Sequence, residues 1–125
     1  MRYLALDVGD RRIGMAVGDE EGGLARPLPT IQRRGLERDV EAVAGAARRE
    51  EAASLLIGLP LTLRGDEGHQ AQRTRRFAEA CVCAGLTVEM ADERFTTSEA
   101  ALRGAPDLDA GAAVVLLEDH FRRRR

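Results

Sequence analysis

Short apolar runs separated by turn residues fill the first quarter of the chain. Residues 2–8 form a nearly continuous apolar run that predicts a buried strand, and apolar alternation resumes at 13–17 after a turn at 9–12. This spacing is typical of a β-hairpin. A third run at 26–31 contains two prolines, which confine it to the edge of a sheet. Residues 1–32 therefore predict a three-stranded antiparallel meander.

Beyond residue 32 the apolar positions change to helical spacing, interrupted by short apolar runs. The predicted elements are, in chain order, a helix at 36–51, a strand at 55–59, a helix at 70–84, a strand at 87–91, a short helix near Ser98 and a helix at 109–121. The run at 55–59 is continuous, as expected for a strand that is buried on both faces. The order βββ-α-β-α-β-α predicts an α/β fold with a five-stranded mixed sheet flanked by helices.

Length and composition favour a single domain. The 125 residues, with an apolar content of 44%, are enough to form one core, which we place at residues 1–121. The basic residues 122–125 are expected to form a disordered tail. No apolar stretch approaches the roughly 18 residues of a membrane span, and no secretion signal is recognisable. We therefore expect a cytoplasmic protein that does not bind membranes.

The distribution of charge leaves nucleic-acid binding open. The net charge of −2 argues against a strongly basic nucleic-acid-binding protein. However, all 19 basic residues are arginine, and most of them occur in clusters. Each cluster has two interpretations: a solvated helix face, or a contact with phosphate, which a guanidinium group binds through two hydrogen bonds.

Acidic residues occur at three places where they can meet at one end of the sheet. Asp7 interrupts the first apolar run, Asp92 and Glu93 follow the last predicted strand, and Asp109 begins the last helix. Converging carboxylates repel each other without a cation, and hard oxygen ligands suit Mg²⁺ or Mn²⁺. Two such ions about 4 Å apart can stabilise both the attacking and the leaving oxygen of a phosphoryl displacement.

Each of these acids also has a simpler interpretation. Asp109 fits an ordinary helix N-cap, and Asp92 with Glu93 fits a solvated turn. Asp7 is the hardest to explain without a partner, because a strand disfavours aspartate and a buried charge is costly.

Five sequence blocks, in order, resemble the YqgF/RuvX family of Holliday junction resolvase-like proteins, also described as pre-16S rRNA nucleases. They are LDVGDRRIGMAVGD, ARPLPTI, IGLPLTLRGDEGHQAQRTRRFAE, DERFTTSEA and DAGAAVVLLEDHF. The resemblance covers roughly residues 3–121. It implies a ribonuclease-H-like fold and a nuclease that depends on Mg²⁺ or Mn²⁺, with two ions in its site.

The resemblance also implies which residues act. The metal ligands would be Asp7, Asp109 and one acid of the DER motif. Both Asp92 and Glu93 match the motif, but neighbours on an extended segment point in opposite directions, so we expect only one of them to be a ligand and prefer Glu93. Arg94 of the same motif would contact phosphate or steady the carboxylates. The candidate substrate-binding residues are Arg11, Arg12, Thr62, Arg64, His69, Gln70, Arg73 and Arg76.

The chain departs from the usual family pattern at two positions. Asp10 stands where the first turn commonly carries a small hydroxylated residue, and Asp107 precedes the last helix where a basic residue is common. Both add negative charge near the expected site, which puts its affinity for phosphate in question.

The favoured function is 5′-end maturation of pre-16S rRNA, with branched DNA as the rival substrate. The chain shows no aromatic platform for reading bases, so recognition should rest on shape and backbone. Expected partners are nucleic acid and ribosomal particles, and the protein would be a monomer or a weak homodimer. Two other classes remain: a non-catalytic nucleic-acid-binding module in ribosome assembly, and one lobe of an actin or sugar-kinase type ATPase. The length argues against the ATPase, which needs two lobes.

Overall fold

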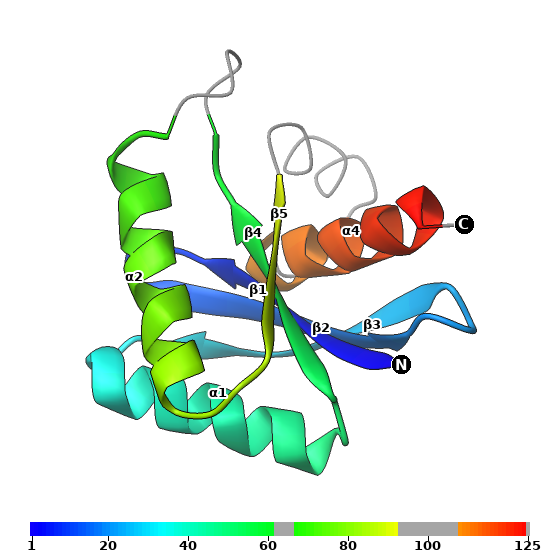
Figure 1. Cartoon of the computed structure of the whole chain (residues 1–125), viewed down its shortest axis with the longest axis horizontal. Helices are drawn as coiled ribbons and strands as arrows, with labels where there is room; N and C mark the ends of the chain where they lie inside the picture. Colours follow the sequence, from blue (N-terminus) through cyan, green and yellow to red (C-terminus); the bar gives the residue numbers. More distant parts are fainter. Residues whose placement is uncertain (62–66, 93–107, 125) are drawn as a thin grey trace.

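The computed structural model describes residues 1–61, 67–92 and 108–124 of the chain (Figure 1). The elements of these segments are, in chain order, β1 (Arg2–Val8), β2 (Arg12–Asp19), β3 (Leu24–Gln32), α1 (Leu36–Arg49), β4 (Ser54–Leu59), α2 (His69–Cys83), β5 (Val88–Asp92) and α4 (Leu108–Arg123). The short helix expected near Ser98 lies outside the described residues. No helix of the described segments is long and apolar enough to cross a membrane.

The strands form one mixed sheet in the order β3-β2-β1-β4-β5, so that β1 is central (Figure 1). The meander pairs antiparallel, whereas β4 pairs parallel with β1 and β5 pairs parallel with β4. This topology confirms the predicted five-stranded mixed sheet. It also confirms that the proline-containing strand lies at an edge, where missing N–H donors leave no ladder bond unmade.

The sheet separates two apolar layers. On one face, side chains of β1 pack with α1 and α2; examples are Leu4, Val43 and Phe77. On the other face, Tyr3 and Ala5 of β1 pack with the buried stripe of α4. Successive side chains of a strand alternate between faces, so the odd-numbered residues of β1 face α4.

Gly18 of β2 lies directly against the backbone of β3 and a side chain of α4. A Cβ atom at this position would lie 2.5 Å from the carbonyl oxygen of Leu24 and 3.2 Å from Leu117 of α4. Only glycine allows both β3 and α4 to pack here.

The C-terminal helix is longer than the sequence predicts. The expected disorder from residue 122 onward is wrong for Arg122, Arg123 and Arg124: the first two continue α4, and Arg124 is anchored beyond its end. Arg124 Nη1 donates a hydrogen bond to the Tyr3 hydroxyl at 2.7 Å and lies 3.5 Å from a carboxylate oxygen of Glu89. These contacts give the basic end of the chain a defined place on the sheet.

Candidate active site

The parallel strands β1, β4 and β5 all end at the same edge of the sheet, which we call the carboxyl edge. In the ladders, Leu6 pairs with Ile57, which pairs with Met90. Asp7 is one residue beyond Leu6, and Asp92 is two residues beyond Met90. The structure therefore brings Asp7 and Asp92 to the carboxyl edge, separated by the two strand spacings of about 4.8 Å from β1 to β5.

Asp7 lies on the face of the sheet that α4 covers. It continues the alternation of Tyr3 and Ala5, both of which belong to the apolar layer under α4. Its side chain is partly buried. A carboxylate in this position requires compensating polar or positive groups, which fits the ligand role that the sequence suggests.

Helix α4 directs its first turn toward the Asp7 end of β1. Its last turn lies at the start of β1, where the rings of Phe121 and Tyr3 are 5.9 Å apart. Asp109 precedes Phe121 by 12 residues, or about 18 Å of helix, and Asp7 follows Tyr3 by about 13 Å of strand. The helix and strand run in roughly opposite directions (Figure 1), so the first turn of α4 approaches the carboxyl edge. The backbone of Asp109 belongs to that turn, whereas its side chain is outside the description.

Side chains of β5 alternate between the two faces of the sheet. Glu89 and Ala91 contact the α4 side, whereas Val88 and Met90 pack on the side of α1 and α2. By alternation, Asp92 belongs to the same face of the sheet as Met90. It also borders a cavity of about 180 Å³ between β5 and α4. Glu93 and Arg94 lie outside the described residues.

The turn between β1 and β2 is fixed from three directions. Gly9 N–H donates to the carbonyl of Arg12 at 2.8 Å, which closes the turn. Arg33 Nη1 donates to the carbonyl of Gly9 at 3.0 Å, and Gln70 Nε2 donates to the carbonyl of Val8 at 2.8 Å. Gln70 therefore holds α2 to the end of β1, and its predicted contact with substrate remains a prediction.

An ion pair between partly buried Arg33 and buried Asp39 supports this turn, and sequence reasoning missed it. Asp39 is 1% exposed; its Oδ2 accepts from Arg33 Nε at 3.1 Å and its Oδ1 accepts from the backbone N–H of Arg34 at 2.9 Å. The Arg33 guanidinium also lies 5.5 Å from the ring centroid of Phe77 in α2. The available signal was an aspartate next to the apolar stripe of a predicted helix, beside an arginine pair.

The candidate substrate-binding residues fall into different environments. Arg11 and Arg12 are exposed on the β1–β2 turn, and His69 and Arg76 are exposed on α2. Arg73 forms an ion pair with Asp10. The added negative charge at the first turn therefore has a positive partner. Thr62 and Arg64 lie outside the described residues.

Tyr3 and His120, two further titratable groups with shifted pKa values, lie at the opposite end of β1 from Asp7. Burial raises the pKa of Tyr3, and a hydrogen bond with Glu89 adds to this effect. Burial lowers the pKa of His120, although the charge of nearby Glu89 acts in the other direction. Because these groups pack at the start of the strand, we treat them as part of the fold rather than of the candidate active site.

The donor chemistry at the carboxyl edge fits Mg²⁺ or Mn²⁺. Within residues 1–61, 67–92 and 108–124 no group of three or more acidic, histidine or cysteine side chains forms a complete site. Of the three expected ligands, the described side chains include Asp7 alone. Its carboxylate is a hard oxygen ligand at the edge where two other strands and the first turn of α4 converge.

Comparison with solved structures identifies the class of fold. Thermus thermophilus RuvC in complex with a Holliday junction matches with a TM-score of 0.66 at 17% identity, covering 99% of this chain and 96% of that chain. The fowlpox virus resolvase in complex with Holliday junction DNA matches with a TM-score of 0.62 at 10% identity, covering 99% of both chains. The fold is therefore the ribonuclease-H-like fold of these resolvases.

Sequence comparison identifies the family. The model of the family described as "RuvX: Holliday junction resolvase" matches residues 1–123. A Thermus thermophilus protein named "Putative pre-16S rRNA nuclease" is 44% identical over 133 aligned positions that cover 98% of each chain. The chain belongs to the RuvX family, which confirms the resemblance seen in its sequence blocks.

Proposed function

We propose that the protein is a metal-dependent phosphodiester hydrolase that acts on structured nucleic acid, and that its substrate is the 5′ end of pre-16S rRNA. The observation that carries the proposal is Asp7, a partly buried carboxylate at the carboxyl edge of the central strand, on the face toward which α4 directs its first turn. Family membership and the name of the Thermus relative support the nuclease class.

In this proposal the chain's own carboxylates hold and orient the reaction. Asp7, Glu93 and Asp109 would hold Mg²⁺ or Mn²⁺, which supplies Lewis-acid charge beside the scissile phosphodiester when bound. The backbone of Asp7 is held because it pairs with Gly14 of β2 and follows directly on Leu6, which pairs with Ile57 of β4. Arg94 would contact the phosphate and orient it for in-line attack.

The parity of β5 supports Glu93 as the third ligand. Residue 93 follows Ala91 by two positions, and Ala91 packs on the α4 side of the sheet, where Asp7 also lies. On this parity we assign the ligand role to Glu93 rather than to Asp92.

The name of the Thermus relative, a pre-16S rRNA nuclease, favours RNA as the substrate. The family description, a Holliday junction resolvase, favours branched DNA. The aromatic rings of the described residues, Tyr3, Phe77 and Phe121, are all buried. No described tyrosine or phenylalanine ring is therefore available for stacking on bases, and recognition would rest on the shape and backbone of the substrate. A protein that cleaves pre-16S rRNA would act in the cytoplasm and bind ribosomal particles, as a monomer or a weak homodimer.

The test is cleavage of two labelled substrates by the wild-type protein: a pre-16S rRNA 5′ fragment and a synthetic four-way DNA junction. Each is incubated with Mg²⁺, Mn²⁺ or EDTA. We expect metal-dependent cutting that is faster on the RNA. Faster cutting of the junction would reassign the substrate to DNA. Tight RNA binding without cutting in any metal would overturn the enzyme and favour the non-catalytic assembly module.

A further inference from the structure

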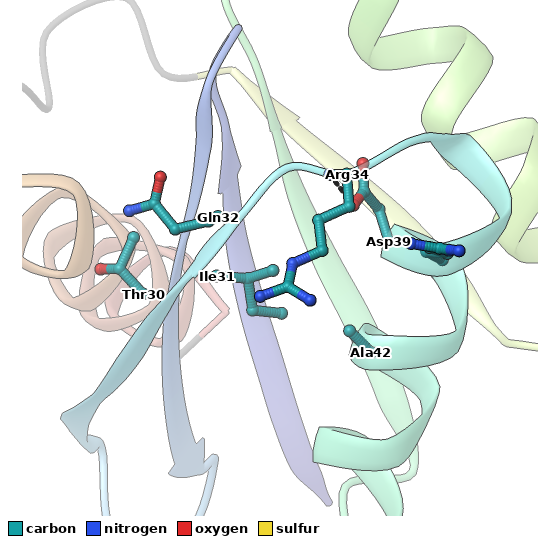
Figure 2. A pocket seen from close by; sticks show the side chains of 7 residues that line it. Thr30, Ile31, Gln32, Arg34, Asp39 and Ala42 are labelled. Atoms are coloured by element: carbon teal, nitrogen blue, oxygen red, sulfur yellow. Dashed lines mark hydrogen bonds between the residues drawn. The ribbon is translucent and has the colours of Figure 1, made fainter.

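A polar cavity of about 450 Å³ lies between the end of β3 and the first turn of α1, outside the candidate active site (Figure 2). Its lining residues come from the last residues of β3, the connection to α1 and the first two turns of α1. They are Thr30, Ile31, Gln32, Arg34, Arg38, Asp39 and Ala42.

The backbone of Arg34 is held in place, whereas the residue is exposed to solvent. Its backbone N–H is held by Asp39 Oδ1 at 2.9 Å. Figure 2 shows its side chain extending beside Ile31 toward Ala42, while Thr30 and Gln32 point to the other side of β3. The cavity thus presents a guanidinium group that leaves the backbone from a fixed position.

The cavity carries two guanidinium groups that no carboxylate of the described residues neutralises. Arg34 and Arg38 are both exposed, and neither forms an ion pair with a carboxylate of the described residues. The acid that lines the cavity, Asp39, is buried and already paired with Arg33. By contrast, the exposed Arg75 of α2 is held by both carboxylate oxygens of Glu67, at 2.6 and 2.7 Å.

The end of β3 that lines the cavity is paired with the turn that follows Asp7. Gln32 pairs with Arg12 in the β2–β3 ladder, and the N–H of Arg33 donates to the carbonyl of Arg11 at 2.9 Å. The exposed Arg11 and Arg12 therefore lie between the carboxyl edge and the cavity. A nucleic acid bound over Asp7 meets a basic path that crosses this turn and continues to Arg34.

We propose that the Arg34–Arg38 cavity binds a backbone phosphate of the nucleic-acid substrate at a position away from the bond that is cut. The proposal rests on the proposed function for the identity of the ligand and adds a second contact region to it. Each of the two guanidinium groups that line the cavity can donate paired N–H groups to the oxygens of a phosphodiester. The contact positions the substrate and carries no sequence information.

The test compares two arginine pairs of the same helix region. The variant Arg34→Gln/Arg38→Gln removes both charges of the cavity, whereas the matched control Arg48→Gln/Arg49→Gln removes two exposed charges at the opposite end of α1. Binding of a labelled pre-16S rRNA fragment is measured by fluorescence anisotropy in EDTA over a series of NaCl concentrations.

We expect the cavity variant to bind about tenfold more weakly and to lower the slope of log K against log salt by about 1 to 2, because one phosphate contact accounts for roughly one unit. The control is expected to stay within about twofold of wild type, as a non-specific charge effect is small when no phosphate is contacted. Equal losses in the two variants would overturn the cavity as a phosphate site, and so would wild-type affinity and slope in the cavity variant.

Two further readouts separate this proposal from the nuclease. Single-turnover cleavage at saturating protein should keep its wild-type rate in the cavity variant, because the contact lies away from the cut bond. If the wild-type protein cuts no substrate, the nuclease fails while the binding comparison still decides the cavity. The single variant Arg38→Gln, at an exposed helix position, repeats the binding test if the double variant has a lowered unfolding temperature.

Discussion

Removing the carboxylate of Asp39 is expected to destabilise the protein much more than breaking an ion pair on the surface. The side chain of Asp39 is 2% exposed and that of its partner Arg33 is 21% exposed. In Asp39→Ala, Arg33 keeps its hydrogen bond to Gly9 but loses its counter-charge. In Arg33→Ala, the buried carboxylate keeps one donor, the backbone N–H of Arg34.

The expected cost follows from which charge is left behind. Breaking a buried pair costs about 3–5 kcal/mol. We expect about 3 kcal/mol for Asp39→Ala, since the remaining guanidinium reaches solvent, and about 4 kcal/mol for Arg33→Ala, since the remaining carboxylate does not. The double variant should cost no more than the larger single change, which corresponds to a coupling energy of about 3 kcal/mol in magnitude.

Urea unfolding of wild type, Asp39→Ala, Arg33→Ala and the double variant measures these free energies. The control is Arg26→Ala, which breaks the pair with Glu50 in which the arginine side chain is 58% exposed. It should cost no more than about 1 kcal/mol. A cost below about 1 kcal/mol for Asp39→Ala, or additive costs in the double variant, would refute the buried pair as the element that fixes the turn beside Asp7.

Three further predictions concern stability and reactivity. Burial lowers the pKa of His120, so His120 of the unfolded chain binds a proton at a higher pH than His120 of the folded protein. The free energy of unfolding should therefore keep its full value above about pH 6.5 and decrease as the pH falls below it. His120→Asn should weaken this decrease, as measured by urea unfolding at several pH values. Gly18→Ala should destabilise by about 2 kcal/mol because its Cβ meets a backbone oxygen at 2.5 Å, whereas Gly45→Ala, within α1, should stabilise by about 0.5–1 kcal/mol because the new Cβ meets nothing closer than 3.5 Å; equal effects of the two in thermal unfolding would contradict this. Burial raises the pKa of Cys81 to about 11, so a thiol reagent at pH 8 should label exposed Cys83 alone in the folded protein, as read by mass spectrometry, and rapid labelling of both would show that Cys81 is accessible.

Most of the fold follows from hydrophobic pattern, because one face of each element must be buried. The helix predicted at 36–51 is observed as Leu36–Arg49, and the helix predicted at 70–84 as His69–Cys83. The prolines of β3 correctly indicated an edge strand. The prediction of a disordered end from residue 122 was wrong for Arg122–Arg124, because composition alone does not show that Arg124 contacts Tyr3, which is 121 residues away in sequence.

The candidate site was predictable only in part. Asp7 was identifiable because a charge in an apolar strand requires an explanation. The arginine clusters were not distinguishable in sequence, since Arg73 and Arg34 both occur in similar basic segments. The structure separates them: Arg73 is paired with Asp10, whereas the backbone N–H of Arg34 is held by buried Asp39 and its guanidinium group forms no ion pair with a carboxylate of the described residues. Such differences depend on contacts between distant parts of the chain, which periodicity does not encode.

The central claim, that Asp7 serves catalysis at the carboxyl edge, is tested most directly by one comparison of cleavage rates. Single-turnover cleavage of the substrate that the wild type cuts is measured in Mn²⁺ for wild type, Asp7→Asn and Asp19→Asn. Asp19 is an exposed aspartate at the opposite end of the same hairpin, so it controls for the loss of one negative charge. We predict a rate at least about 100-fold lower for Asp7→Asn, with an unchanged unfolding temperature, and a wild-type rate for Asp19→Asn. A wild-type cleavage rate in folded Asp7→Asn would contradict the account.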